Sequence, residues 1–168
     1  MRILMIALLG GLLPAGVLFA QNSDVPASKA TADQITDDLK DGRKVAGMCR
    51  TCHGLDGKAR IPIAPHIGGE TVDYLMAQLH AFKSGEREHE MMTVVARGLS
   101  AAQIRDVATW FNHFDVVTTL PAGKTEDDAP ELCVGCHGVN GISDLPDAPN
   151  LAGETNIYIE TQIKAFRT

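Results

Sequence analysis

The sequence lacks a surplus of basic residues. Lys and Arg total 15 against 21 Asp and Glu, and removing residues 1–20, which contain one basic residue, leaves 14 against 21, a formal charge of −7. An acidic balance of this size argues against nucleic acid and anionic membranes as partners, because their phosphates carry the same sign. It mildly favours a partner with a basic docking surface.

The chain also lacks long apolar runs after its first twenty residues, so we expect the rest of it to be soluble. Before that point Arg2 is the only charge, residues 3–19 are almost wholly apolar, and Ala20 is a small residue suited to cleavage. This layout predicts a secretory signal peptide over residues 1–20, with cleavage after Ala27 as a second option. A retained membrane anchor is the alternative, since the run is close to the length that spans a bilayer. Either way the chain is exported, and we expect a periplasmic protein.

No segment shows the convincing alternation of apolar and polar residues that indicates strands, so we expect an all-α fold. The predicted helices start near Asp41, cover residues 71–83 and run from Ser100 to Phe114. The first of them carries two cysteines, and Gly85 ends the second. The third begins with a capping box of Ser100 and Gln103. Its apolar face is made of Ile104, Val107, Ala108, Phe111 and Phe114.

Four cysteines in an exported chain ordinarily indicate disulfides, but here their spacing indicates another chemistry. They form two Cys-x-x-Cys-His motifs, which are Cys49, Cys52 and His53, then Cys133, Cys136 and His137. Two cysteines three positions apart on a helix face the same side, so both thiols can form thioethers with one porphyrin. The His that follows then lies beneath the iron as its ligand. We therefore predict two covalently bound haem c groups, with His53 and His137 as axial ligands.

Other uses of paired cysteines fit less well. A structural zinc site also uses Cys-x-x-Cys, but it gives no reason for a His directly after both pairs. A thioredoxin-like redox pair needs a setting rich in strands, which this sequence does not provide.

Both motifs belong to an internal repeat with an offset of 84 residues. The matched residues include Gly54 with Gly138, Pro65 with Pro149, Gly69–Glu70–Thr71 with Gly153–Glu154–Thr155, and Gln78 with Gln162. Such a repeat predicts two copies of one haem-sized module. We expect a first haem domain over residues 21–115, a linker over 116–128 and a second haem domain over 129–168. The second copy stops at the residue matching Ser84, so we expect an incomplete domain in a chain truncated by roughly thirty residues.

The residue on the far side of each iron is less obvious. Met91 and Met92 lie far enough after His53 for the chain to cross the haem, and because adjacent side chains point in different directions only one should bind iron. The remaining candidates are Met48, which adjoins the attachment motif, Met76, which fits an apolar helix face, and His66, His80, His89 and His113, which are expected on the surface. The second copy has no Met or His after His137, so its sixth ligand stays open.

The motifs resemble those of dihaem class I cytochromes of the cytochrome c4 type. The resemblance rests on Cys-x-x-Cys-His-Gly, on the two later prolines and on Gly-Glu-Thr leading to Tyr and Gln. The run over residues 81–86, followed by Met92 and residues 96–100, is also similar to the cytochrome subunit of flavocytochrome c sulfide dehydrogenase. The resemblance covers nearly all of the exported chain and implies two tandem class I cytochrome c domains.

The resemblance further implies roles for individual residues. In that family the ligand methionine stands seven residues before the Leu or Tyr that opens the last helix, and counting back from Leu99 gives Met92, which we prefer to Met91. A proline carbonyl accepts a hydrogen bond from the axial histidine, a position that Pro65 and Pro149 match.

Two departures from the family pattern concern the second domain. Glu126 stands where the first copy has the helix glycine, Gly42. Pro130 falls where helix is needed, so we predict that the second attachment helix begins there, at its first turn. Both features affect the packing of the domain and leave its attachment motif intact.

The function that follows is transfer of single electrons, not enzyme catalysis. Iron with His and Met on opposite faces has no place for substrate, and a Met ligand raises its potential. The resemblance implies redox partners such as a terminal oxidase, a cytochrome bc1-type complex or a periplasmic flavoprotein dehydrogenase, of which the chain could be the haem-carrying subunit. We expect the protein to associate with the membrane only through such a partner or through an uncleaved signal sequence. A third hypothesis, catalysis or ligand sensing at an open second iron, is tested by carbon monoxide binding.

Overall fold

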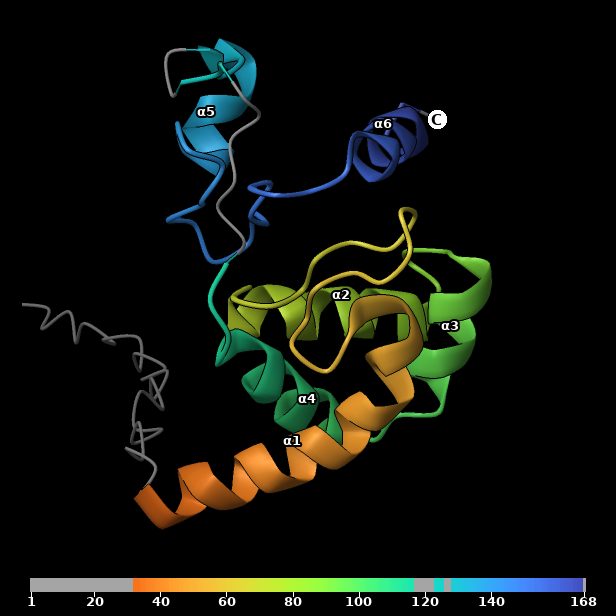
Figure 1. Cartoon of the computed structure of the whole chain (residues 1–168). Coiled ribbons are helices and arrows are strands. Elements are labelled where there is room, and N and C mark those ends of the chain that lie inside the picture. Colours follow the sequence, from red (N-terminus) through yellow and green to blue (C-terminus); the bar gives the residue numbers. More distant parts are fainter. Residues whose placement is uncertain (1–31, 117–122, 126–127, 168) are drawn as a thin grey trace, which may run out of the picture.

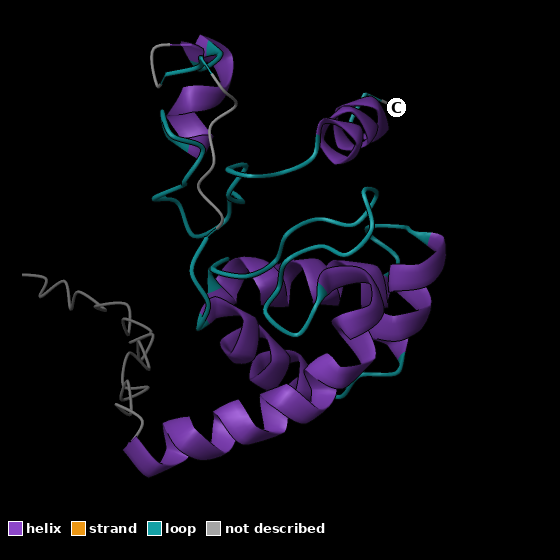
Figure 2. Ribbon diagram, in the orientation of Figure 1, coloured by secondary structure: helices purple, strands orange, loops and turns teal. Residues whose placement is uncertain are grey.

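The computed structural model describes residues 32–116, 123–125 and 128–167, with side chains from residue 39 onward. Within this part of the chain all regular elements are helices, as predicted (Figure 2). None of the described helices is long and apolar enough to cross a bilayer. The predicted signal peptide and much of the predicted linker lie outside the described residues, so the domain boundaries stay predictions. Below, the first module denotes residues 32–116 and the second module denotes residues 128–167.

The first module is built on the crossing of helices α1 (Ala32–His53) and α4 (Ala101–Asn112) (Figure 1). Gly42 makes this crossing close, because a Cβ atom there would lie 2.2 Å from the carbonyl oxygen of Asp106 and 2.8 Å from Cβ of Trp110. The prediction that α1 is short and starts near Asp41 was wrong, since the helix begins at Ala32. Its first turns carry mostly polar residues, so they show no apolar periodicity, yet no Gly or Pro interrupts them.

The hydrophobic core lies between α1, α4 and α2 (Val72–Ser84). Its buried members are Val45, Ala46, Leu75, Leu99, Ile104, Val107, Ala108 and Phe111. Four of the five residues predicted for the apolar face of the last helix are therefore buried, while Phe114 is half-buried beyond the helix end. The indole N–H of Trp110 donates to the carbonyl of Leu55 at 2.8 Å, which ties α4 to the loop after the attachment motif.

Helix α2 begins and ends as the sequence predicts, and α4 begins as predicted but ends at Asn112, two residues before the predicted end at Phe114. The side chain of Thr71 accepts a hydrogen bond from the Tyr74 amide, and α2 ends at Gly85, whose φ of 88° lies in the left-handed region. Ser100 and Gln103 form the predicted capping box at the start of α4. Both helices thereby satisfy amide groups that have no partner inside the helix.

Helix α3 (Glu90–Arg97) was not predicted. Its cap is His89, whose Nδ1 accepts hydrogen bonds from the amides of Met91 at 3.2 Å and Met92 at 3.3 Å. Histidine is not among the residues that usually cap helices, so the sequence carries no start signal here. The two methionines therefore lie in the first turn of a helix and not in a loop.

The second module contains helices α5 (Glu131–His137) and α6 (Asn156–Ala165). Pro130 is the residue before α5, which confirms the predicted start of that helix. Neither helix has a buried residue, and Leu132 and Phe166 are 99% and 77% exposed. Both helices lie on the side of the first module that carries the loop between α1 and α2 (Figure 1). Hydrogen bonds between loops join the modules there.

Candidate haem sites

The first attachment motif is the last turn of α1. Cys49 is half-buried, and its Sγ lies 3.9 Å from the Val45 carbonyl. Burial, with a smaller contribution from Cys52, raises the pKa of the Cys49 thiol to about 11, so that thiol is protonated at neutral pH. The structure records all four cysteines of the chain as free thiols. Two thiols one helical turn apart are thus available to the vinyl groups of one porphyrin.

His53 is held by a single hydrogen bond. It is 7% exposed, and its Nδ1 lies 3.0 Å from the carbonyl oxygen of Pro65. A carbonyl can only accept, so Nδ1 must carry the proton and Nε2 keeps its lone pair. Burial lowers the pKa of the imidazole, and the Pro65 carbonyl offsets part of this effect. A neutral imidazole with a free Nε2 is the form that binds iron.

The second module repeats this geometry. Nδ1 of His137 lies 2.8 Å from the carbonyl oxygen of Pro149. The loop that carries each proline folds back in the same way, because Gly57 accepts from the amides of residues 67 and 68, and Gly141 accepts from those of residues 151 and 152. Both glycines have φ near +75°, which a residue with a Cβ rarely adopts. The hydrogen bond that the resemblance implies is present in both modules.

The two sites differ in how well the described residues cover them. The first lies beside the hydrophobic core of its module, with Cys49 packed against that core. In the second, Cys136 is exposed and His137 is half-buried, and no apolar side chain of the module's described residues is buried. The first attachment motif is therefore shielded by apolar side chains, and the second is open to solvent within the described residues.

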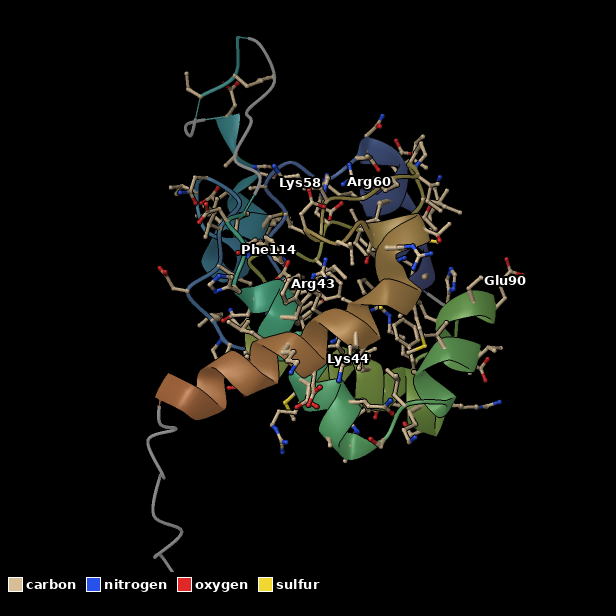
Figure 3. All side chains as sticks on the ribbon, turned by 60° about the horizontal axis from the view of Figure 1, so that its bottom comes forward. Arg43, Lys44, Lys58, Arg60, Glu90 and Phe114 are labelled. Carbon is tan, nitrogen blue, oxygen red and sulfur yellow. The ribbon has the colours of Figure 1, made fainter. Side chains whose placement is uncertain are left out.

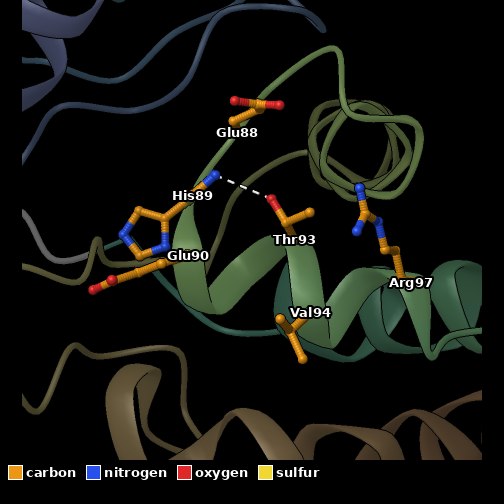
Figure 4. Close-up of a pocket in the computed structure, with 6 residues that line it drawn as sticks. All are labelled: Glu88, His89, Glu90, Thr93, Val94 and Arg97. Atoms are coloured by element: carbon orange, nitrogen blue, oxygen red, sulfur yellow. Dashed lines mark hydrogen bonds between the residues drawn. The ribbon is translucent and has the colours of Figure 1, made fainter.

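The two methionines of α3 differ in exposure. Met91 is 60% exposed, while Met92 is half-buried. A depression of about 300 Å³ lies on the outer side of the same helix, lined by Glu88, His89, Glu90, Thr93, Val94 and Arg97 (Figure 4). The amide of His89 donates to Thr93 Oγ1 at 3.0 Å within it. None of the predicted haem-binding residues lines this depression, although His89 in its wall lies close enough to His53 to lower the pKa of that imidazole.

The structure also tests the other candidate ligands. His80, His89 and His113 are exposed and Met76 packs against the core, as predicted. The prediction of a surface position for His66 was wrong. It is half-buried between the modules, where its Nδ1 accepts from the Ala59 amide at 3.0 Å and its ring interacts with the carbonyl of Gly153. Its partner comes from the other copy of the repeat, which spacing within one copy does not reveal.

Exposed basic side chains lie on α1 and on the loop after the first attachment motif, although the chain is acidic overall. Arg43 and Lys44 lie on the exposed side of α1, and Lys58 and Arg60 lie on the following loop (Figure 3). Two of them are in exposed ion pairs, Lys44 with Asp41 at 2.8 Å and Arg60 with Asp56 at 3.1 Å. The predicted acidic balance is therefore not uniform over the surface.

These features fit haem c. Each module has two free thiols on one helical turn, followed by an imidazole whose Nδ1 is engaged and whose Nε2 is free. Within the described residues no three His, Cys, Asp or Glu side chains gather into a site for a directly bound metal ion. Each module therefore presents two thiols and one oriented imidazole, the groups that attach haem c and bind one face of its iron.

Comparison with known proteins identifies the family. No family model matches the chain. Cytochrome c4 of Pseudomonas aeruginosa is 30% identical over 144 residues, which cover 77% of this chain and 71% of that protein. The chain belongs to the cytochrome c4 family. It is therefore a dihaem c-type cytochrome with covalently bound haem c, and its function is electron transfer.

Two further similarities refine this assignment. The chain is similar to crystalline reduced recombinant cytochrome c4 from Pseudomonas stutzeri, with a TM-score of 0.65 and 28% identity over 77% of this chain and 80% of that one. It is also 31% identical over 139 residues to the thiosulfate dehydrogenase electron acceptor of Thiomonas intermedia, covering 73% of this chain and 64% of that protein. The predicted fold of two tandem class I cytochrome c domains agrees with this cytochrome c4 architecture.

Proposed function

We propose that this member of the cytochrome c4 family carries single electrons between periplasmic redox partners. The first haem would be held by Cys49, Cys52, His53 and Met92, and the second by Cys133, Cys136 and His137. The observation that carries the proposal is the hydrogen bond from each histidine to a proline carbonyl, at 3.0 Å and 2.8 Å, directly after a helical pair of free thiols. When bound, haem iron supplies a one-electron couple between its ferrous and ferric states.

The residues of the chain contribute orientation, basicity and shielding. The carbonyls of Pro65 and Pro149 orient their imidazoles and raise the basicity of Nε2. The core beside Cys49 keeps water from the first site. Met92 would add a thioether on the opposite face, a ligand that raises the reduction potential and closes the iron to substrate. Its lower exposure than Met91 supports this choice.

The partner that we propose is a dehydrogenase. The similarity to proteins named thiosulfate dehydrogenase electron acceptor supports it. Whether the chain is a free carrier or a bound, non-catalytic subunit is decided by co-purification with such an enzyme. A terminal oxidase, a cytochrome bc1-type complex and a flavoprotein sulfide dehydrogenase stay predicted partners.

The experiment that tests the partner uses absorbance of the haems. The oxidised protein is mixed with purified thiosulfate dehydrogenase and thiosulfate, and we expect both haems to become reduced. If dithionite reduces both haems and the enzyme with thiosulfate reduces neither, the partner is wrong and the carrier function stands. If dithionite reduces no haem, the carrier function itself is wrong.

Export of the chain is part of the proposal. The apolar run behind Arg2 supports cleavage and release into the periplasm. Cell fractionation followed by mass measurement should find the protein in the periplasm without residues 1–20. An intact N-terminus in the membrane fraction would favour the anchor instead.

A further inference from the structure

One peptide group of the second module has both of its polar atoms engaged by residues of different modules. The carbonyl of Pro149 accepts from Nδ1 of His137 at 2.8 Å. The N–H of the same peptide belongs to Asn150 and donates to the carboxylate of Glu70, at 3.0 Å to Oε1 and 3.2 Å to Oε2. A carboxylate of the first module therefore connects to the proposed axial histidine of the second through a single peptide group.

The first module contains the matching arrangement. The carbonyl of Pro65 accepts from Nδ1 of His53 at 3.0 Å, and the N–H of the same peptide, that of His66, donates to the carboxylate of Glu154. Unlike Glu70, which accepts on both oxygens, Glu154 has one buried oxygen, Oε2, without a hydrogen-bond partner among the described residues. Glu154 is the residue that matches Glu70 in the repeat. Contacts that are made twice, with the roles of the two copies exchanged, are typical of an isologous interface.

Further paired contacts hold the modules in this position. The hydroxyl of Thr71 donates to the carbonyl of Pro146 at 3.0 Å, and the matching hydroxyl of Thr155 donates to the carbonyl of Pro62 at 2.6 Å. Arg87 donates at 2.6 Å both to Gln78 and to Gln162, another matched pair. Each glutamate is thus kept beside the peptide group of the other module.

Burial strengthens the connection. Glu70 is 3% exposed and Asn150 is 8% exposed, so the hydrogen bonds between them are shielded from water. A hydrogen bond to an ionised acceptor is stronger than one between neutral groups, and hydrogen bonds in a chain polarise one another in a medium of low dielectric. A carboxylate on the N–H makes the carbonyl of the same peptide a better acceptor. The imidazole that donates to this carbonyl then becomes a more basic ligand, which favours ferric iron.

We propose that one glutamate of each module, Glu70 in the first and Glu154 in the second, lowers the reduction potential of the haem in the other module. Glu70 acts on the second haem through the Pro149–Asn150 peptide and His137, and Glu154 acts on the first through the Pro65–His66 peptide and His53. Both glutamates are positioning residues, since neither contacts an iron ligand directly. The inference deepens the proposed function and rests on it, because it requires both histidines as axial ligands.

The test replaces Glu70 by Gln in the haem-loaded full chain. This substitution keeps an oxygen acceptor of the same shape and removes the charge. The equilibrium constant for reducing the second haem should rise about three- to tenfold, where tenfold corresponds to about 59 mV for a one-electron couple. At pH 9, where both carboxyls are largely ionised, the first haem should keep its potential, and Glu154→Gln should give the reverse pattern. A redox titration followed by the NMR signals of the haem methyl groups measures the two haems separately.

Two control variants separate this effect from simpler ones. Asp73→Asn removes an exposed charge from the first turn of α2, close to Glu70 in sequence, and tests a general effect of charge. Arg87→Gln loosens the interface without altering the Glu70 hydrogen bonds and tests an effect of docking. In the reduced, diamagnetic protein, the signal of the His137 Nδ1 proton should also move upfield in Glu70→Gln, as expected for a weaker hydrogen bond.

The outcomes are distinct. The inference is overturned if both haems shift equally, if neither shifts while both are bound, or if either control variant reproduces the result. A wild-type protein that binds no haem would instead contradict the proposed function.

The shift should also depend on pH, because only an ionised carboxyl acts in this way. Burial raises the pKa of Glu70 to about 7 and that of Glu154 to about 8, so the effect should be largest near pH 9 and absent near pH 5.5.

Other groups beside the two carboxyls set the background of such a pH profile. The two carboxyls act on each other, since Glu70 raises the pKa of Glu154. Other titratable or charged side chains that interact with them or with their neighbours are Lys58, Asp56, His66, Tyr74, Arg87 and Tyr158. Burial lowers the pKa of His66 and raises the pKa values of Tyr74 and Tyr158, so these groups stay neutral over most of the range between pH 7 and 9. The two glutamates are therefore the groups at this interface whose charge should change between pH 7 and 9.

Discussion

Replacing Gly42 by Ala tests how the first module is packed. A Cβ at this position would lie 2.2 Å from the carbonyl oxygen of Asp106, 2.9 Å from its carbonyl carbon and 2.8 Å from Cβ of Trp110. Two of these atoms belong to the backbone of α4 and cannot rotate away. Because ordinary contact begins near 3.4 Å, α1 and α4 must separate by about 1 Å, which weakens the packing of the whole core.

The magnitude follows from the cost of overpacking, which is about 1–3 kcal/mol at a well-packed site. Alanine recovers part of this cost, since it favours a helix over glycine by about 1 kcal/mol. The net loss should therefore be about 0–2 kcal/mol. For a domain of this size, a loss of 1 kcal/mol lowers the melting temperature by about 4–8 °C.

Gly47 on the same helix provides a matched control. A Cβ there would meet only the guanidinium of Arg50, at 3.8 Å, which is ordinary contact with a flexible side chain. Gly47→Ala should therefore raise stability by about 0.5–1 kcal/mol. The assay is thermal unfolding of the haem-loaded protein followed by far-UV circular dichroism. If Gly42→Ala melts at the same temperature as Gly47→Ala, the close crossing of α1 and α4 is refuted.

Three further predictions concern ligation, interface and packing. Met92→Ala should abolish the weak absorbance band at the red end of the visible spectrum that reports Met–iron ligation, and Met91→Ala should leave it; the opposite result would assign Met91. Because burial raises the pKa values of Glu70 and Glu154 from 4.5 to about 7 and about 8, the folded protein holds protons that the unfolded chain has released. The stability contributed by this pair is therefore fully present below pH 4.5 and is lost as the pH rises through 7 to 8. The urea midpoint of unfolding should fall between pH 5.5 and 8.5. If the midpoint of the Glu70→Gln, Glu154→Gln double variant falls by the same amount over this pH range, the two glutamates are not its cause. Trp110→Phe should cost about 0.5–1.5 kcal/mol through loss of the bond to the Leu55 carbonyl, measured by urea unfolding, whereas an unchanged midpoint would show that this bond contributes nothing.

Local chemistry made much of the first module predictable from the sequence. The Ser100–Gln103 box, the Thr71 cap and the left-handed Gly85 each satisfy amide or carbonyl groups by contacts within a few residues. The buried face of α4 follows from helical periodicity in the same way. Helix α3 was not predicted because its cap is His89. The predicted start of α1, near Asp41, was too late because the first turns of this helix are polar.

The interface between the modules was not predictable from either copy alone. Its contacts join residues about 75 to 93 positions apart, and no local pattern reveals which side chains meet. Position 66 illustrates the limit. Its counterpart Asn150 differs in type, yet Asn150 accepts from the Ser143 amide at 3.0 Å and donates to the Gly69 carbonyl, which reproduces the two contacts of His66. Both a side-chain amide and an imidazole offer a donor and an acceptor. Aligning the two copies by residue identity therefore does not show that His66 and Asn150 make equivalent contacts.

The number of haems and electrons per chain tests the central claim most directly. The purified mature protein is weighed by mass spectrometry under denaturing conditions, and its oxidised form is then titrated with dithionite under anaerobic conditions. We expect the mass of the chain plus two covalently bound haems, and two electrons taken up in one-electron steps. A chain that carries one haem or none, or that takes up fewer than two electrons, would contradict the assignment as a dihaem electron carrier.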